Sequence, residues 1–185
     1  PPSRRTSGLL QRVPGIASLE PDGRLVLTDG ASIGPVDDLI YCTGYRYHYP
    51  FLDERIVQVV DNHVAPLYRE ILHAKHPTLG FIGIPFRVVP FPLFEQQATW
   101  FARLLAGDFA LPTEADRFAE VERHAEMLAA SGVRRRHFHQ RSLDCYDYLD
   151  ELSRQCGSPP VPDWHRALNA AFMAHAAAHP GDYRD

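Results

Sequence analysis

The sequence predicts an α/β fold that ends in a helical tail. Before residue 85, short apolar runs are bounded by glycine and proline, as is typical of strands joined by turns. From residue 93 onward, apolar side chains recur every three or four residues, as in amphipathic helices. The 185 residues fit one domain, or one domain with an appendage, and with 45% hydrophobic residues they can bury one sizeable core.

Residues 16–28 contain the first predicted strands. Two short alternating runs flank Pro21-Asp22-Gly23, and Gly23 can take the positive φ that a tight turn requires. The pattern therefore predicts a β-hairpin.

Two further segments are predicted to be buried strands. Residues 36–42 end in an apolar run that Thr43-Gly44 terminates, and residues 79–84 form a short apolar run with two glycines. Between these segments, residues 45–51 are rich in aromatic side chains, and Pro50 excludes a regular helix there. We therefore expect a loop at residues 45–51.

The first helix is predicted over residues 93–106. Pro92 fits its first turn, where the missing N–H group costs nothing, and Gly107 suits the position just past its end. In the tail, Thr113 forms a predicted capping box with Asp116. Ser142 and Asp163 are the predicted N-caps of two later helices.

The charge balance and the hydropathy exclude two classes of partner. The 19 Lys and Arg residues against 23 Asp and Glu residues give a formal net charge of −4, which argues against a nucleic acid. No apolar run approaches the roughly 20 residues of a membrane helix, so no membrane partner is expected.

The cysteines and the start of the chain indicate a location and an origin. The three cysteines form no close pair, which argues against a disulfide framework and fits a cytoplasmic protein. Cys42 is interpreted as a packed residue of a predicted strand, not as a nucleophile. The chain begins at Pro1 without an initiator methionine, which either processing or a break in a longer chain explains equally simply. We expect it to be a fragment of a longer protein.

One short motif suggests a hydrolase. Residues 30–34 match the GxSxG pattern, in which the serine, here Ser32, sits on a sharp turn between a strand and a helix. Pro35 and a predicted strand come next here, so we interpret the motif as a glycine-rich loop.

No metal site is predicted from the ten histidines. His137 with His139, and His175 with His179, are spaced like ligand pairs, but neither pair has a third ligand nearby. The basic run at residues 134–136 is interpreted as a solvated turn, because the net charge is negative.

Two segments have the form of ligand-binding sites. Thr43-Gly44-Tyr45 follows a predicted strand, and ligands bind at the carboxyl ends of strands in open α/β sheets. Residues 79–83 lead to a helix start whose N–H groups and partial positive charge suit the electron-rich edge of a flavin. The alternatives are a glycine that merely ends a strand and an ordinary core helix.

These segments resemble flavin-containing monooxygenases. Asp38 to Tyr45, followed by Tyr49-Pro50-Phe51-Leu52, is similar to the buried strand, Thr-Gly-Tyr turn and Pro-Phe loop of that family. The further matches are Leu67 to His73, Pro77 to Gly83, Val88 to Pro92, Gln97 to Gly107, and Leu111-Pro112. Together they resemble the carboxyl-terminal part of these enzymes over residues 16–112, and the tail resembles it more loosely.

The resemblance implies the carboxyl-terminal part of a flavoprotein fold with two dinucleotide-binding domains. Residues 1–45 would be the end of the NADPH-binding domain and its return strand, and residues 46–111 the closing part of the FAD-binding domain. Residues 112–185 would be the carboxyl-terminal helical region. The implied activity uses FAD, NADPH and dioxygen: a hydroperoxide at C4a of the flavin oxygenates nucleophilic nitrogen or sulfur of a small amine, thiol or thioether.

The resemblance also implies site residues. Thr43, Gly44 and Tyr45 would line the cleft between the two cofactors, and Gly83 and Gln97 would lie near the flavin. It assigns no catalytic residue and no oligomeric state. Because no GxGxxG fingerprint occurs in the chain, we expect the chain alone to be inactive. The alternative is a catalytically silent, truncated flavoprotein-like binding or interaction module.

Overall fold

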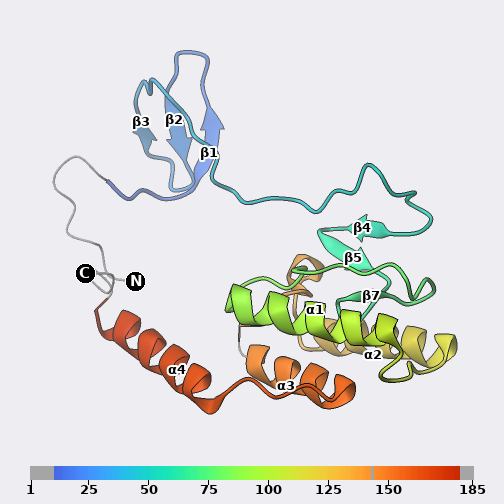
Figure 1. The fold of residues 1–185 in the computed structure, drawn as a ribbon. Helices are drawn as coiled ribbons and strands as arrows, with labels where there is room; N and C mark the ends of the chain where they lie inside the picture. Colours follow the sequence, from blue (N-terminus) through green and yellow to red (C-terminus); the bar gives the residue numbers. More distant parts are fainter. Residues whose placement is uncertain (1–10, 143, 180–185) are drawn as a thin grey trace. The chain divides into compact units, whose positions relative to one another are not determined.

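The computed structural model describes residues 11–142 and 144–179. Residues 45–166 form the larger of two compact units, and the described parts of residues 1–44 and 167–185 form the smaller one (Figure 1). Among these described residues, no helix has both the length and the apolar character that crossing a membrane requires.

The smaller unit contains an antiparallel sheet. Its strands are β1 (Ile16–Leu19), β2 (Leu25–Leu27) and β3 (Ser32–Ile33), in that spatial order. Between β1 and β2, Gly23 has a φ of 84°, and its N–H donates to the carbonyl of Glu20 at 3.0 Å. The predicted hairpin at residues 16–28 is therefore confirmed.

The predicted buried strand at residues 36–42 is wrong. The segment has no regular secondary structure, and Ile40 and Tyr41 are 82% and 78% exposed. A strand needs neighbours that pair with its N–H and C=O groups. Within the described part of the chain, residues 37–46 make no backbone–backbone hydrogen bond. For the same reason Cys42 is exposed, and the prediction that it packs inside a strand is wrong.

The larger unit begins with small hairpins. Strand β4 (Gln58–Val60) pairs with β5 (His63–Ala65), and β6 (Leu67–Tyr68) pairs with β7 (Leu72–His73). Residues 45–51 form the expected loop. The strand predicted at residues 79–84 is reduced to one antiparallel bridge between Gly80 and Leu72, because Gly83 turns the chain with a φ of 86°.

Helices dominate the chain from residue 90 to residue 178 (Figure 1). They are α1 (Pro90–Ala106), α2 (Glu114–Ala130), α3 (Cys145–Cys156) and α4 (Asp163–Ala178), with one 3₁₀ turn at Arg135–His137. The helix predicted over residues 93–106 is confirmed as α1, although it begins earlier, at Pro90. Gly107 ends it with a φ of 82°, as predicted. Helix α4 starts at Asp163, close to the predicted boundary.

The caps of α2 and α3 differ in outcome. Thr113 Oγ1 accepts a hydrogen bond from the Asp116 N–H at 3.2 Å, which confirms the capping box. Ser142 is not the cap of α3, because that helix starts only after Asp144. The Asp144 side chain does not cap α3 either, since it pairs with Arg141 at 2.5 Å.

The main core of the larger unit lies where α1 packs on α3. Trp100 of α1 and Leu149 and Leu152 of α3 are fully buried there, together with Tyr68 of β6. The Trp100 indole N–H donates to Gln155 Oε1 at 3.1 Å, so its polar edge is also satisfied. This packing fixes α1, and hence the loop that leads into it, against α3.

Candidate functional site

Gly83 and Gln97, two of the predicted site residues, are in direct contact. The Gly83 N–H donates to Gln97 Oε1 at 2.9 Å. Gln97 is fully buried on α1, and Gly83 lies in the loop before that helix. A Cβ at Gly83 would meet the Phe94 ring at 2.9 Å, and the φ of 86° also disfavours other residues. Glycine is therefore required here for both conformation and space.

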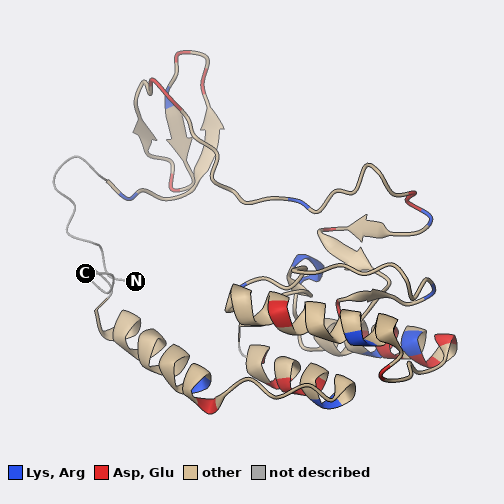
Figure 2. Ribbon diagram, viewed as in Figure 1, with Lys and Arg blue, Asp and Glu red and all other residues tan. Residues whose placement is uncertain are grey.

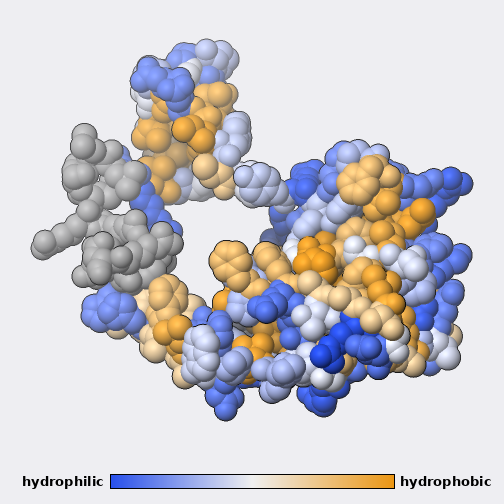
Figure 3. Space-filling model, in the orientation of Figure 1, coloured by the Kyte–Doolittle hydropathy of each residue, from blue (hydrophilic) through white to orange (hydrophobic). Residues whose placement is uncertain are grey.

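The N-terminus of α1 follows this loop. Pro90 and Pro92 lack N–H groups, so Phe91 has the one N–H among the first three helical residues. Val89, the N-cap residue, makes no side-chain capping bond. Phe91 is 82% exposed. Hydrophobic patches are visible on the face of the molecule that Figure 3 shows. The helix start therefore combines a partial positive charge with an apolar surface, but has fewer free N–H groups than the sequence predicts.

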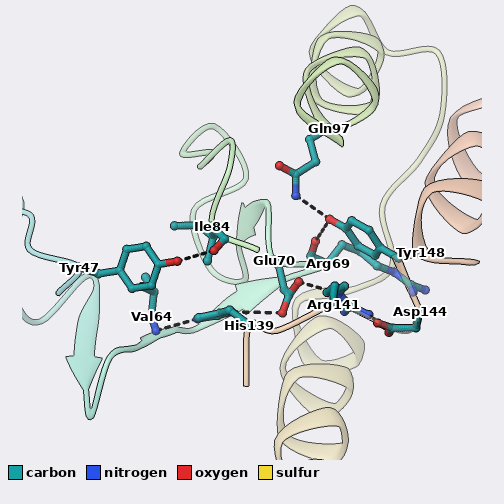
Figure 4. Close-up of polar contacts among 10 residues, drawn as sticks. All are labelled: Tyr47, Val64, Arg69, Glu70, Ile84, Gln97, His139, Arg141, Asp144 and Tyr148. Carbon is teal, nitrogen blue, oxygen red and sulfur yellow. Dashed lines mark hydrogen bonds and ion pairs between the residues drawn. The ribbon is translucent and has the colours of Figure 1, made fainter. Parts of the chain in front are cut away.

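The Gln97 amide has a second buried partner. Its Nε2 donates to the Tyr148 hydroxyl at 2.8 Å, and that hydroxyl donates to the carbonyl of Arg69 at 2.7 Å (Figure 4). Tyr148 comes from α3, and Arg69 from the turn between β6 and β7. The Tyr148 hydroxyl of α3 thus joins α1 to the turn between β6 and β7.

Glu70 lies at the centre of a buried ionic cluster. His139 Nδ1 donates to Glu70 Oε1 at 3.1 Å, and Arg141 Nε donates to Oε2 at 2.8 Å (Figure 4). His139 Nε2 accepts the Val64 N–H at 2.9 Å, so this nitrogen carries no proton and the ring is neutral. Burial alone would raise the pKa of Glu70, but the bond from His139 and the charge of Arg141 outweigh it and lower that pKa.

The turn that carries Arg69 and Glu70 has an uncommon backbone. Their φ angles are 54° and 55°, and the Ile71 N–H donates to the carbonyl of Tyr68 at 3.1 Å. L-residues in this region cost about 1–2 kcal/mol each. The side-chain bonds of Glu70 and the carbonyl bond of Arg69 hold the turn. Sequence reasoning misses it, because the turn lacks the Gly, Asn or Asp that marks such turns.

Open hollows lie on the described part of the larger unit. A hollow of about 980 Å³ lies among residues 46–62 and Arg136. Tyr47 lines it, and its hydroxyl donates to the carbonyl of Ile84 at 2.5 Å. A second cavity of about 340 Å³ lies over Glu70 and is bordered by α2 and α3, along which both signs of charge occur (Figure 2).

The other three predicted cofactor residues are Thr43, Gly44 and Tyr45. Thr43 and Gly44 belong to the smaller unit, and both are exposed. Tyr45 opens the larger unit and is 99% exposed, so it makes almost no contact within that unit. Within the larger unit, the predicted residues that are in contact are Gly83 and Gln97.

The other candidate motifs form no reactive centre. Ser32 lies in β3, and irregular residues follow it where a hydrolase would need a helix. Both ring nitrogens of His139 are occupied, and the rings of His175 and His179 stack on each other at 4.3 Å. In the described ranges, no three His, Cys, Asp or Glu side chains are grouped so as to hold a metal ion.

A comparison with protein families identifies the chain. The family described as "FMO-like: Flavin-binding monooxygenase-like" matches residues 2–166. The chain belongs to this family. Two relatives from Arabidopsis thaliana, flavin-containing monooxygenases FMO GS-OX-like 4 and FMO GS-OX-like 3, are each 40% identical to it over 172 residues. These matches cover 92% of the chain but only 38% of either relative, so the chain spans little more than a third of their length.

Two solved structures share the fold of this chain. The S-allyl-L-cysteine S-oxygenase from Allium sativum is 36% identical, with a TM-score of 0.84 over 97% of this chain and 43% of its own. Tmm from Pelagibacter sp. strain HTCC7211 is 21% identical, with a TM-score of 0.65 over 83% of this chain and 34% of its own. The second likeness supports the fold alone.

One histidine of this flavin-binding monooxygenase-like chain makes its stability depend on pH. His63 lies against His139, with the ring centroids 5.0 Å apart, and its Nδ1 is buried without a hydrogen-bond partner. Burial, and then the neighbouring His139 ring and the charge of Arg135, lower the pKa of His63 to about 4. An unfolded histidine binds a proton near pH 6.5. Between pH 6.5 and 4 the unfolded state therefore binds more protons, and stability falls as the pH falls.

We expect the urea midpoint of the chain to fall when the pH is lowered from 7 to 5, and His63→Gln to reduce that fall. The cause is that the variant no longer has an imidazole that must stay neutral when folded. His48→Gln, at an exposed position, should keep the pH dependence of the parent. Equal pH dependence of His63→Gln and the parent would contradict this prediction.

Proposed function

We propose that the chain is the carboxyl-terminal part of an FAD- and NADPH-dependent monooxygenase. Its substrates would be small molecules with a nucleophilic nitrogen or sulfur, namely an amine, a thiol or a thioether. Family membership supports a flavin cofactor and an oxygenase reaction. The S-oxygenase that shares the fold over 97% of the chain supports sulfur as the atom that is oxygenated.

The contact between Gly83 and Gln97 carries this proposal. Because Gly83 has no side chain, its backbone packs closely against the Phe94 ring, and the buried Gln97 amide keeps the loop in that conformation. The adjoining N-terminus of α1 provides a partial positive charge for the electron-rich edge of a flavin. Phe91 adds an exposed apolar surface beside it. These groups fit a flavin ring, which is flat, largely apolar and polar at one edge.

The domain assignment is part of the same proposal. Residues 1–45 would end the NADPH-binding domain of a two-dinucleotide fold, residues 46–111 would close the FAD-binding domain, and residues 112–185 would be the helical region. The division into two compact units after Gly44 supports a boundary there. We also propose a cytoplasmic location for the protein.

Thr43, Gly44 and Tyr45 would line the cleft between FAD and NADPH. All three are exposed, which leaves their surfaces free to meet a cofactor. Gly44 has a φ of 89° and open space around its Cα, so a ligand can approach the backbone there.

Bound flavin, once reduced, supplies the electrons that activate dioxygen. The described residues would bind the flavin and orient it. Gln97 holds the Gly83 amide, and Tyr148 holds Gln97. Burial raises the pKa of Tyr148, so its hydroxyl keeps the proton that it donates to the Arg69 carbonyl. Because Gln97 and Tyr148 are buried, water does not compete for these bonds.

The second candidate function is a catalytically silent binding or interaction module. One observation favours it: the sequence contains no GxGxxG fingerprint. Much of the hold on a dinucleotide comes from glycine-loop N–H groups around the pyrophosphate.

We expect FAD to be retained only when the chain is joined to an upstream segment that carries two glycine fingerprints. The 185-residue chain and the joined protein are incubated with excess FAD and desalted, and their absorption spectra are recorded. NADPH oxidation and sulfoxide formation are then measured with S-allyl-L-cysteine as the probe. The joined protein should hold about one flavin per chain and consume NADPH, and the chain alone should do neither.

Two glycine variants of the joined protein test the site itself. Gly83→Ala should weaken flavin binding, because its Cβ would displace the Phe94 ring and strain the loop. Gly132→Ala has a similar φ of 75° but open space, and should leave flavin binding unchanged. A joined protein that holds no flavin and consumes no NADPH would support the silent module. Equal flavin affinity of the two variants would remove Gly83 from the site.

A further inference from the structure

The hydrogen bonds around Tyr148 permit only one arrangement. A phenol has a single proton, and the Arg69 carbonyl can only accept, so Tyr148 donates to that carbonyl at 2.7 Å. The partner on its other side must therefore donate, which places Gln97 Nε2 toward Tyr148 at 2.8 Å. Gln97 Oε1 then faces the Gly83 N–H at 2.9 Å. The orientation of the amide follows from this chemistry and not from a choice between its oxygen and nitrogen.

The Tyr148 side chain is itself held on several sides. The Arg141 guanidinium lies over its ring, 4.4 Å from the centroid, and Glu70 in turn binds Arg141 (Figure 4). The Arg69 carbonyl belongs to the turn with positive φ angles, which Glu70 also anchors. Neither the ring nor the accepting carbonyl can shift without disturbing the buried ionic cluster.

We propose that Tyr148 is a positioning residue, which acts through Gln97 to hold the Gly83 amide and the loop that enters α1. The inference rests on the proposed function, since it is this loop that would face the flavin. Tyr148 does not touch the flavin in this scheme. Its hydroxyl sets which way the Gln97 amide points, and the amide sets the conformation at Gly83.

The first test measures hydrogen exchange of the Gly83 amide by NMR in the 15N-labelled 185-residue chain. Tyr148→Phe should speed exchange of this amide about tenfold, because Gln97 loses the acceptor that orients it. Tyr146→Phe is the matched control: it is on the same helix, and its hydroxyl donates to the His165 carbonyl at 3.1 Å. It should change Gly83 exchange less than twofold. The exchange rate of the Leu152 amide, in the core of α3, reports general loosening of the structure. If Tyr148→Phe raised the exchange rate at Leu152 as much as at Gly83, the proposal would be overturned.

A second variant tests whether the two side chains act in series. Gln97→Met removes the acceptor for the Gly83 N–H and should speed its exchange at least as much as Tyr148→Phe does. If Tyr148 acts only through Gln97, the double variant should exchange no faster than Gln97→Met. If the two side chains acted independently, the increase in exchange rate of the double variant would be the product of the two single increases. That result would overturn the proposal that Tyr148 acts through Gln97, which we call the hydrogen-bond relay.

The final test separates this inference from the proposed function. In the flavin-loaded joined protein, Tyr148→Phe and Gln97→Met should both weaken flavin binding about tenfold, whereas Tyr146→Phe should not. If the Gly83 exchange responds as expected but flavin affinity does not change, the role of Tyr148 toward the flavin is overturned and the hydrogen-bond relay stands. A joined protein that binds no flavin in any form contradicts the proposed function, and the exchange data still decide the relay.

Discussion

Glu70→Gln should lower the free energy of unfolding of the larger unit by about 3 kcal/mol. Both carboxylate oxygens of Glu70 accept hydrogen bonds, from His139 and from Arg141. Glutamine has only one acceptor, so its NH₂ group would face one of these donors. The guanidinium of Arg141 is 12% exposed, so its charge would stay buried, with Asp144 as its remaining partner. Because that partner remains, we expect a loss of stability at the lower end of the range for a broken buried ion pair.

The measurement is urea unfolding of the parent and the variant at pH 7, monitored by circular dichroism. Asp144→Asn is the matched control, because it removes the other partner of the same arginine. Asp144 is 51% exposed, so its loss should cost less than about 1 kcal/mol. If both variants lower the free energy of unfolding equally, the contacts of Glu70 contribute no more stability than an exposed ion pair does.

The elements that sequence analysis predicts correctly depend on local signals. Gly23 permits the hairpin turn, Gly107 ends α1, and Thr113 caps α2, each through a bond to residues only a few positions away. The strand predicted at residues 36–42 depends instead on partners that apolar character does not reveal. Where no neighbour pairs with its backbone, the same apolar run lies exposed.

The candidate site divides in the same way. Gly83 and Gln97 are 14 residues apart, on a loop and the helix that follows, and the family resemblance predicts that both lie near a flavin. His139 and Glu70 are 69 residues apart, and Tyr148 and Arg69 are 79 apart. Helical periodicity predicts which face of α3 is buried, but it does not reveal which distant carbonyl a tyrosine hydroxyl meets. These contacts therefore require the three-dimensional structure.

The polar contacts explain why the loop before α1 can be rigid although it has little secondary structure of its own. One end is held by the Gly80 bridge to β7, and its middle by the Gly83–Gln97 bond. Tyr47 adds a bond to the carbonyl of Ile84. All three depend on α1 and the hairpins staying in place, so the packing of α1 on α3 determines how well the loop is ordered.

Trp100→Ala should therefore have the largest effect on the larger unit, lowering its free energy of unfolding by about 3–5 kcal/mol. Trp100 is fully buried and packs against Tyr68 and Phe109, with ring centroids 6.3 and 5.3 Å away. Its removal leaves a cavity between α1 and α3, and Gln155 Oε1 loses the indole N–H from which it accepts a hydrogen bond.

The control for this variant is the other tryptophan of the chain. Trp164 is 60% exposed, so Trp164→Ala should change the free energy of unfolding by no more than about 0.5 kcal/mol. Urea unfolding followed by circular dichroism compares both variants without relying on tryptophan fluorescence. Because Gln97 lies one turn before Trp100 on α1, looser packing of that helix should also speed exchange of the Gly83 amide. A Trp100→Ala protein that is destabilised but keeps slow Gly83 exchange would show that Gln97 and Tyr148 hold the loop without help from the α1–α3 core.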